Sequence, residues 1–208
     1  MMMQVHTAEL MVTRESRECS AVSPPEDELV SRVLRGEEAA FTEIVALFQN
    51  RLFNFVRSRV RNRELAEDIT QEVFVKAYYN LDRLRDPARF KCWLFSIAHN
   101  HLRDLARRRK IETVDTEESG IEHYVDKATP QSVDDRERTA AMVRAALSRL
   151  KPEQREILVL CDIEGMAYKE ISQAMGIPLG TVQSRIFYAR RRLKEVLTDE
   201  MGFAGEEI

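Results

Sequence analysis

The segment from Ala167 to Leu197 constrains the fold most, because two short amphipathic patterns meet there at a glycine. In the first pattern, apolar side chains lie one helical turn apart: Tyr168, Ile171 and Met175. Gly176 can take the left-handed conformation that ends a helix, and Pro178 is preset for the first turn of the next one. The spacing therefore predicts two helices joined by a tight turn.

The second helix has one apolar face and one face that is polar and then basic. Its apolar residues recur at helical spacing: Val182, Ile186, Ala189, Leu193 and Val196. From Arg185 to Lys194 every charged residue is positive. Two helices with a basic second helix are typical of a helix-turn-helix that enters a DNA major groove. A helical hairpin with a solvated basic face is the alternative, but the small residues that open the helix favour DNA binding.

Composition indicates an all-α protein of one ordinary domain or two small ones. The chain has 208 residues, of which 32% are charged, with only 7 glycines and 6 prolines. No apolar run approaches the roughly 20 residues of a membrane span, and the N-terminus lacks the apolar core of a signal peptide. We expect a cytoplasmic protein without membrane insertion.

The cysteines and the net charge limit the function further. Cys19, Cys92 and Cys161 are too far apart for a disulfide framework or a zinc site. Buried reduced thiols are the favoured interpretation and a redox switch the alternative. The net charge is −3, whereas an autonomous DNA-binding protein usually has a positive balance. The charge predicts weak DNA binding by the free chain and implies a partner.

Upstream, the pattern predicts a leader over 1–25 and three helices. The first runs from Glu26 to Arg35, the second follows an apolar stripe from Phe41 to about Val60, and the third, capped by Asn62, spans Glu64–Leu81. The third helix has a core face and an opposite side with Phe74 and Tyr78. Acidic and amide side chains make its full burial expensive, so we expect this side to dock on a partner.

A loop comes next, and Asp86-Pro87 predicts the start of a long helix that ends near Arg109. Its predicted inner stripe is Phe90, Leu94, Ile97, Ala98, His101 and Leu105. Ser96, His99, Arg103 and Arg107 are expected to point away, and His101 is interpreted as a core histidine. Residues 111–134 are acidic and aperiodic, which is typical of a linker.

Two motifs resemble those of bacterial σ70-family factors, in particular the extracytoplasmic-function (ECF) group. GIPLGTVQSRIFYARRRL and the preceding LSRLKPEQREILVLCDIEGMAYKEISQAMG resemble region 4. AEDITQEVF and WLFSIAHNHLRDLAR resemble region 2. One residue departs from the family pattern, because Gln183 stands where Lys or Arg is usual. The resemblance covers about residues 26–110 and 135–197.

The resemblance implies transcription initiation by a dissociable subunit of RNA polymerase. The expected fold is all-α, with a region 2 helical bundle (26–110) and a region 4 helix-turn-helix (135–197). A leader (1–25), an acidic flexible linker (111–134) and a tail (198–208) complete the chain. The implied partners are core RNA polymerase, promoter DNA and an anti-sigma factor. No cofactor, metal or enzymatic activity is expected.

The resemblance also implies three sets of contact residues. The core-polymerase set is Asp68, Gln71, Glu72 and Phe74. The set for the −10 promoter element is Arg83, Arg89, Phe90, Lys91, Trp93, Asn100, Arg103, Arg107 and Arg108. The set for the −35 element is Gly180, Thr181, Gln183, Ser184, Arg185, Phe187, Tyr188, Arg190 and Arg191.

Two other functions are compatible with parts of the sequence. A self-sufficient helix-turn-helix regulator would need dimer symmetry, and no coiled-coil seam is visible in the sequence. An enzyme could use Glu67, Asp68 and Glu72 to hold a metal for phosphoryl chemistry. However, no matching carboxylate pair, nucleophile motif or glycine-rich phosphate loop accompanies them.

Overall fold

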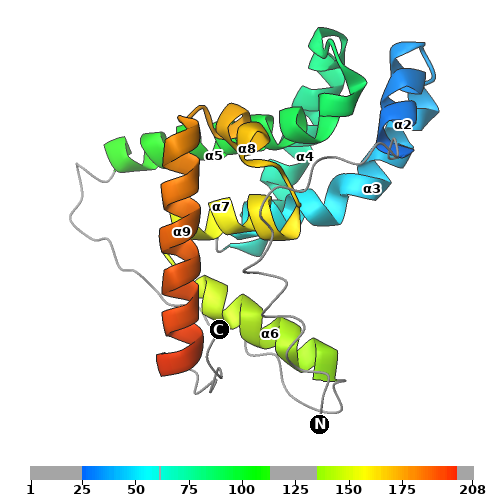
Figure 1. Cartoon of the computed structure of the whole chain (residues 1–208). Helices are drawn as coiled ribbons and strands as arrows, with labels where there is room; N and C mark the ends of the chain where they lie inside the picture. Colours follow the sequence, from blue (N-terminus) through cyan, green and yellow to red (C-terminus); the bar gives the residue numbers. More distant parts are fainter. Residues whose placement is uncertain (1–24, 61, 113–134, 201–208) are drawn as a thin grey trace.

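A computed structural model of the chain describes residues 25–60, 62–112 and 135–200 (Figure 1). The predicted leader, acidic linker and tail lie almost wholly outside the described residues. Within the described ranges every regular element is helical and none is a strand, which confirms the predicted all-α fold. No helix in this part of the chain combines the length and apolarity that a membrane crossing requires.

The helices form two units in chain order. The N-terminal unit (residues 25–60 and 62–112) contains α2 (Pro25–Leu34), α3 (Glu38–Arg57), α4 (Arg63–Asn80), the 3₁₀ turns Leu81–Arg83 and Pro87–Arg89, and α5 (Phe90–Glu112). The C-terminal unit (residues 135–200) contains α6 (Asp135–Ser148), α7 (Pro152–Leu158), the π-helical turn η4 (Val159–Ile163), α8 (Tyr168–Met175), α9 (Leu179–Glu195) and a second π-helical turn (Val196–Glu200).

Local chemistry determines where the N-terminal helices begin. The Asn62 side chain accepts a hydrogen bond from the Leu65 amide at 2.9 Å, so it caps α4 as predicted.

The core joins α3 to α5 through two edge-on ring pairs. Their centroids are 5.4 Å apart for Phe48–Phe90 and 5.2 Å apart for Phe55–Phe95.

The helix-turn-helix forms as the sequence predicts. Gly176 ends α8 in the left-handed conformation with φ of 65°, and α9 begins directly after Pro178. The Ser172 hydroxyl donates to the Ile177 carbonyl at 2.6 Å and closes the turn. The whole predicted apolar face of α9 is buried: Val182, Ile186, Ala189, Leu193 and Val196.

The two units are in direct contact, which the sequence did not indicate. Figure 1 shows α8 lying along α5, and these two helices pack together. Buried apolar residues of both units form one continuous core. Helix α9 is attached to this body through α8 and through its packing on α7.

Two side chains, Phe74 and His99, lie where the sequence did not place them, and a third, Phe90, fits only one of its two predicted roles. Phe74 is only 7% exposed, because α4 packs against both α3 and α5 and is covered on two sides. Phe90 is 1% exposed, which agrees with the predicted inner stripe and rules out its predicted base contact in this conformation. His99, expected to point away, is buried because α5 meets the C-terminal unit there.

Cys92 is buried and Cys161 is half-buried, and both are free thiols. Burial raises the pKa of the Cys92 thiol, and burial together with Asp162 raises the pKa of Cys161 to about 12. The thiolate is the reactive form of cysteine. These two side chains therefore support the interpretation of inert structural thiols.

We expect Cys161 to react with iodoacetamide at pH 8 at least about 100-fold more slowly in the native protein than in urea, since the thiolate is scarce, and we expect Cys92 to be slowed in the same direction. Peptide mapping by mass spectrometry after timed alkylation measures each rate. The urea-unfolded chain is the control, because unfolding removes the desolvation that raises both pKa values. Rapid native labelling of Cys161 would instead favour a redox role.

Candidate nucleic-acid interface

The outward face of α9 is exposed and carries two aromatic rings. Phe187 is 63% and Tyr188 is 59% exposed, and their rings meet edge-on with centroids 5.4 Å apart. Gly180, Gln183 and Ser184 are exposed at the start of the same helix. A Cβ added at Gly180 would have no heavy atom within 4 Å, so the fold does not require glycine there. The predicted −35 residues in this group share one accessible face.

The basic residues of α9 differ in how far they are available. Arg185 is exposed, and Arg191 forms only an exposed ion pair with Glu195 at 3.2 Å. Arg190, in contrast, is half-buried and pairs with Asp162 at 2.6 Å. The guanidinium of Arg190 thus fixes α9 to the η4 turn, and its contact with phosphate stays a prediction.

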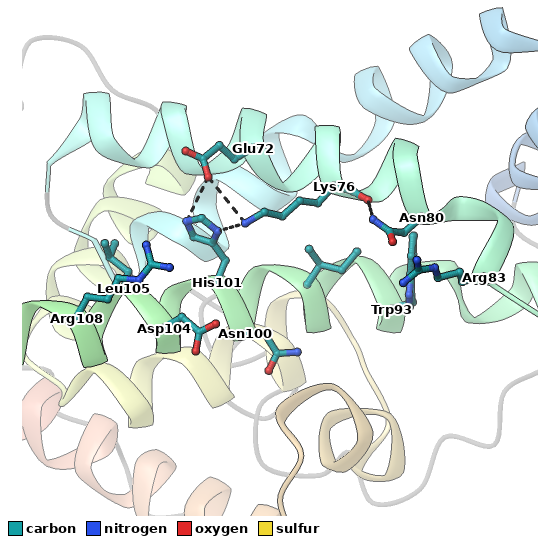
Figure 2. Close-up of a pocket in the computed structure, with 11 residues that line it drawn as sticks. Glu72, Lys76, Asn80, Arg83, Trp93, Asn100, His101, Asp104, Leu105 and Arg108 are labelled. Carbon is teal, nitrogen blue, oxygen red and sulfur yellow. Dashed lines mark hydrogen bonds and ion pairs between the residues drawn. The ribbon is translucent and has the colours of Figure 1, made fainter.

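A cavity of about 500 Å³ lies between α4 and α5. Figure 2 shows side chains from both helices pointing into it. Four predicted −10 residues line this cavity: Arg83, Trp93, Asn100 and Arg108. Arg103 and Arg107 are exposed elsewhere on α5. The structure thus brings together residues from the loop, from the start of α5 and from its basic end.

Two other predicted −10 residues are engaged in contacts of their own. Arg89 pairs with Asp86 at 3.4 Å, and this pair is exposed on both sides. Lys91 donates from Nζ to the Glu164 carbonyl at 3.3 Å, across the contact between the two units. Lys91 therefore faces the C-terminal unit rather than open solvent.

One wall of the cavity contains a largely exposed polar cluster that sequence reasoning missed. Lys76 Nζ donates to His101 Nδ1 at 2.6 Å, while Glu72 lies 3.9 Å from Lys76 Nζ and 3.7 Å from His101 Nε2 (Figure 2). Burial and the neighbouring Lys76 lower the pKa of His101, so the ring is neutral at pH 7 and can accept this bond. His101 is a cavity residue rather than the core histidine predicted.

The outer face of α4 combines acidic, amide and apolar groups. Asp68 and Gln71 are exposed there as predicted, and Glu72 is exposed at the edge that this face shares with the cavity. Val75 is 54% and Tyr79 is 76% exposed beside them. Sequence reasoning did not include these two, although Gln71, Val75 and Tyr79 recur at every fourth residue, which would have placed them on one face.

No group of three or more His, Cys, Asp or Glu side chains in the described ranges is arranged to hold a metal ion. Glu67, one of the three carboxylates considered for a metal, forms an ion pair with Arg63 at 2.8 Å. The described residues therefore give no support to the metal-dependent alternative.

Family models match both units of the chain. The model described as Sigma-70 region 2 matches residues 44–111, and that described as Sigma-70, region 4 matches residues 140–193. The first match contains the α4 face and the cavity. The second contains the helix-turn-helix.

Curated relatives and solved structures agree with these matches. The chain is 33% identical over 180 residues to the RNA polymerase sigma-H factor of Pseudomonas aeruginosa, covering 83% of this chain and 93% of that protein. It is 30% identical over 173 residues to the ECF RNA polymerase sigma-E factor of Escherichia coli, covering 79% and 90%.

Two solved structures are similar over most of the chain. One is the sigma factor RpoE in complex with the anti-sigma factor NepR from Bartonella quintana, with a TM-score of 0.64, 29% identity and coverage of 77% of this chain and 98% of that one. The other is CnrH in complex with the cytosolic domain of CnrY, with a TM-score of 0.57, 28% identity and coverage of 84% and 97%.

Proposed function

Since the chain belongs to the ECF group of RNA polymerase sigma factors, we propose that it joins core polymerase and directs it to promoters with two DNA-contacting surfaces. Residues 26–110 form the core-binding and −10-binding domain in this proposal, and residues 135–197 form the −35-binding domain. In the proposal the leader precedes the first domain, the linker joins the two domains and the tail follows the second. The observation that carries the proposal is that α9 exposes its polar and basic face to solvent while its apolar stripe is fully buried.

The −35 element is read by the first half of α9. Small residues at Gly180 and Ser184 allow close approach to the groove floor, and Gln183 reads a base edge from the same face. Phe187 packs on a thymine methyl. Arg185 and Arg191 contact phosphates and fix the register.

The −10 element is bound at the cavity between α4 and α5. Unpairing a base costs a few kcal/mol, and stacking on a protein ring recovers about 1–3 kcal/mol. Trp93 supplies such a ring at the cavity rim, and the Asn100 amide supplies hydrogen bonds. Arg103, Arg107 and Arg108 neutralise the phosphates of the open strand.

Core polymerase docks on the outer face of α4. Asp68, Gln71 and Glu72 supply polar contacts, and Val75 and Tyr79 supply the apolar area that a stable interface requires. The similar structure from Bartonella quintana is a complex of a sigma factor with an anti-sigma factor. We assign a partner of the same class to this chain, and no enzymatic step of its own.

Asp68→Ala combined with Gln71→Ala is expected to weaken core binding about tenfold, the effect of losing roughly 1.4 kcal/mol at an interface. Fluorescence titration of labelled core polymerase measures the affinity, and run-off transcription measures initiation. Circular dichroism verifies that helicity is unchanged.

Glu38→Ala with Gln49→Ala is the matched control, because it removes one acid and one amide from exposed positions on α3. Core affinity should then remain that of the wild type. Unaltered affinity in the α4 variant would refute the docking face. Tight, specific promoter binding by the free protein, without polymerase, would favour the self-sufficient regulator.

A further inference from the structure

We infer that the free protein rests in a closed state in which the C-terminal unit is latched onto the N-terminal unit by two buried carboxylates, Glu156 and Glu164, and that it must open to initiate transcription. This inference rests on the proposed function. The latch lies outside the DNA-contacting face of α9 and outside the cavity between α4 and α5. Both carboxylates belong to the C-terminal unit, and the side chains that pair with them belong to the N-terminal unit.

Glu156 is the deeper of the two carboxylates. It is 1% exposed and points from α7 into the contact between the units. Its Oε1 lies 2.7 Å from His99 Nδ1, and its Oε2 lies 3.2 Å from Arg59 Nη1. A buried carboxylate without partners is strongly unfavourable. Glu156 is therefore satisfied by the N-terminal unit in the closed state and by water once the units separate.

Glu164 forms the second point of the latch, just after the η4 turn. It is 6% exposed, and its Oε2 lies 2.8 Å from Arg51 Nη2. Arg51 is already positioned by its own unit, since its guanidinium lies over the Phe48 ring at 4.7 Å and pairs with Glu26 at 3.0 Å. A preorganised partner reduces the entropy lost when the ion pair forms.

Polar contacts surround these two carboxylates. Arg155 donates from Nη1 to the Ser58 carbonyl at 2.7 Å, and the Cys92 thiol donates to the Glu170 carbonyl at 3.3 Å. Apolar packing of α8 on α5 adds to these polar contacts, since buried apolar residues of both units form one core. The charged pairs fix the geometry of the contact, and water can replace each polar partner once the units separate.

The closed state cannot place both DNA-contacting surfaces on one promoter. Elements centred near −10 and −35 are about 25 base pairs apart, which is about 85 Å at 3.4 Å per pair. A compact protein of this length has a radius of gyration of about 17 Å and is about 45 Å across. With α8 packed along α5, α9 cannot reach −35 while the cavity holds −10, so the units must separate.

The test uses full-length protein with Glu156→Gln, Glu164→Gln or both, which keep the side-chain shape and remove the charge. We expect the radius of gyration from small-angle X-ray scattering to rise by at least several ångström. The sigma concentration for half-maximal run-off transcription at fixed core should fall about tenfold, because the competent fraction rises. Circular dichroism and thermal melting report whether each variant is folded.

Glu28→Gln is the matched control, because Glu28 forms an exposed ion pair of 2.9 Å with Arg35 within the N-terminal unit. It should change neither quantity. Arg59→Met removes the Glu156 contact from the other side, and its effect on the radius should not add to that of Glu156→Gln, because the two residues form one interaction.

A folded Glu164→Gln or double variant with wild-type radius and wild-type transcription would overturn the latch. If Glu156→Gln does not fold, Glu164→Gln decides alone. If the wild type supports no initiation with core polymerase, the proposed function fails, while the scattering measurements still decide whether the latch exists.

Discussion

Ile186→Ala is expected to lower the free energy of unfolding by about 2–5 kcal/mol, the usual range for removing a large apolar side chain from a packed core. Ile186 is 2% exposed at the centre of the buried face of α9, and α9 packs against both α7 and α8. The cavity left by the shorter side chain would be enclosed by other buried apolar residues, so the loss of stability should be large. Urea unfolding followed by circular dichroism at 222 nm gives the difference.

Gln183→Ala is the control for this measurement, because it shortens an exposed side chain of the same helix outside the buried face. Its effect on stability should remain within about 0.5 kcal/mol. Comparing the two variants separates the effect of the buried face of α9 on stability from the effect of its exposed side chains. A loss below about 1 kcal/mol for Ile186→Ala would mean that the helix-turn-helix can collapse around the missing atoms.

Gln183→Arg should shift the −35 preference by about 1–3 kcal/mol at a single base pair, which is the usual value of one bidentate base contact. Glutamine pairs with the N6 and N7 edge of adenine, whereas arginine prefers the O6 and N7 edge of guanine. Gln183 is exposed on the first turns of α9 and is accessible to a groove. Transcription of a randomised −35 library with core polymerase measures the preference.

Arg191→Ala is the companion variant for promoter reading. Its side chain is 68% exposed and lies one turn beyond Phe187, so we assign it to phosphate. It should weaken all sites about equally and lower the salt dependence of binding. If Gln183→Arg leaves the preference flat while Arg191→Ala changes it, the two roles are reversed.

Features set by neighbouring residues could be predicted from the sequence. The Asn62 cap, the glycine turn at Gly176 and the buried stripe through Ile186 depend on contacts within a few residues. Their outcomes depend on side-chain chemistry and helical periodicity alone. The all-α fold was predictable for the same reason.

Features that depend on packing between distant helices could not be predicted in this way. Phe74 and His99 are buried by helices from elsewhere in the chain, and Arg190 is paired with Asp162 across the helix-turn-helix. The sequence left two alternatives for α4, full burial or docking. The structure combines them, because α4 is covered on two sides and exposes a third face with Val75 and Tyr79.

The π-helical turn at Val159–Ile163 has a consequence for how the length of this segment can change in evolution. Such a turn contains one residue more than regular α-helical winding would use. Deleting a single residue there would restore regular winding while the residues on either side keep nearly the same orientation. Glu164 would then stay beside Arg51. A deletion within the regular winding of α7 would instead rotate everything after it by about 100°, and Glu164 would leave Arg51. The π-helical turn is therefore the place in this segment where the loss of one residue disturbs the contact least.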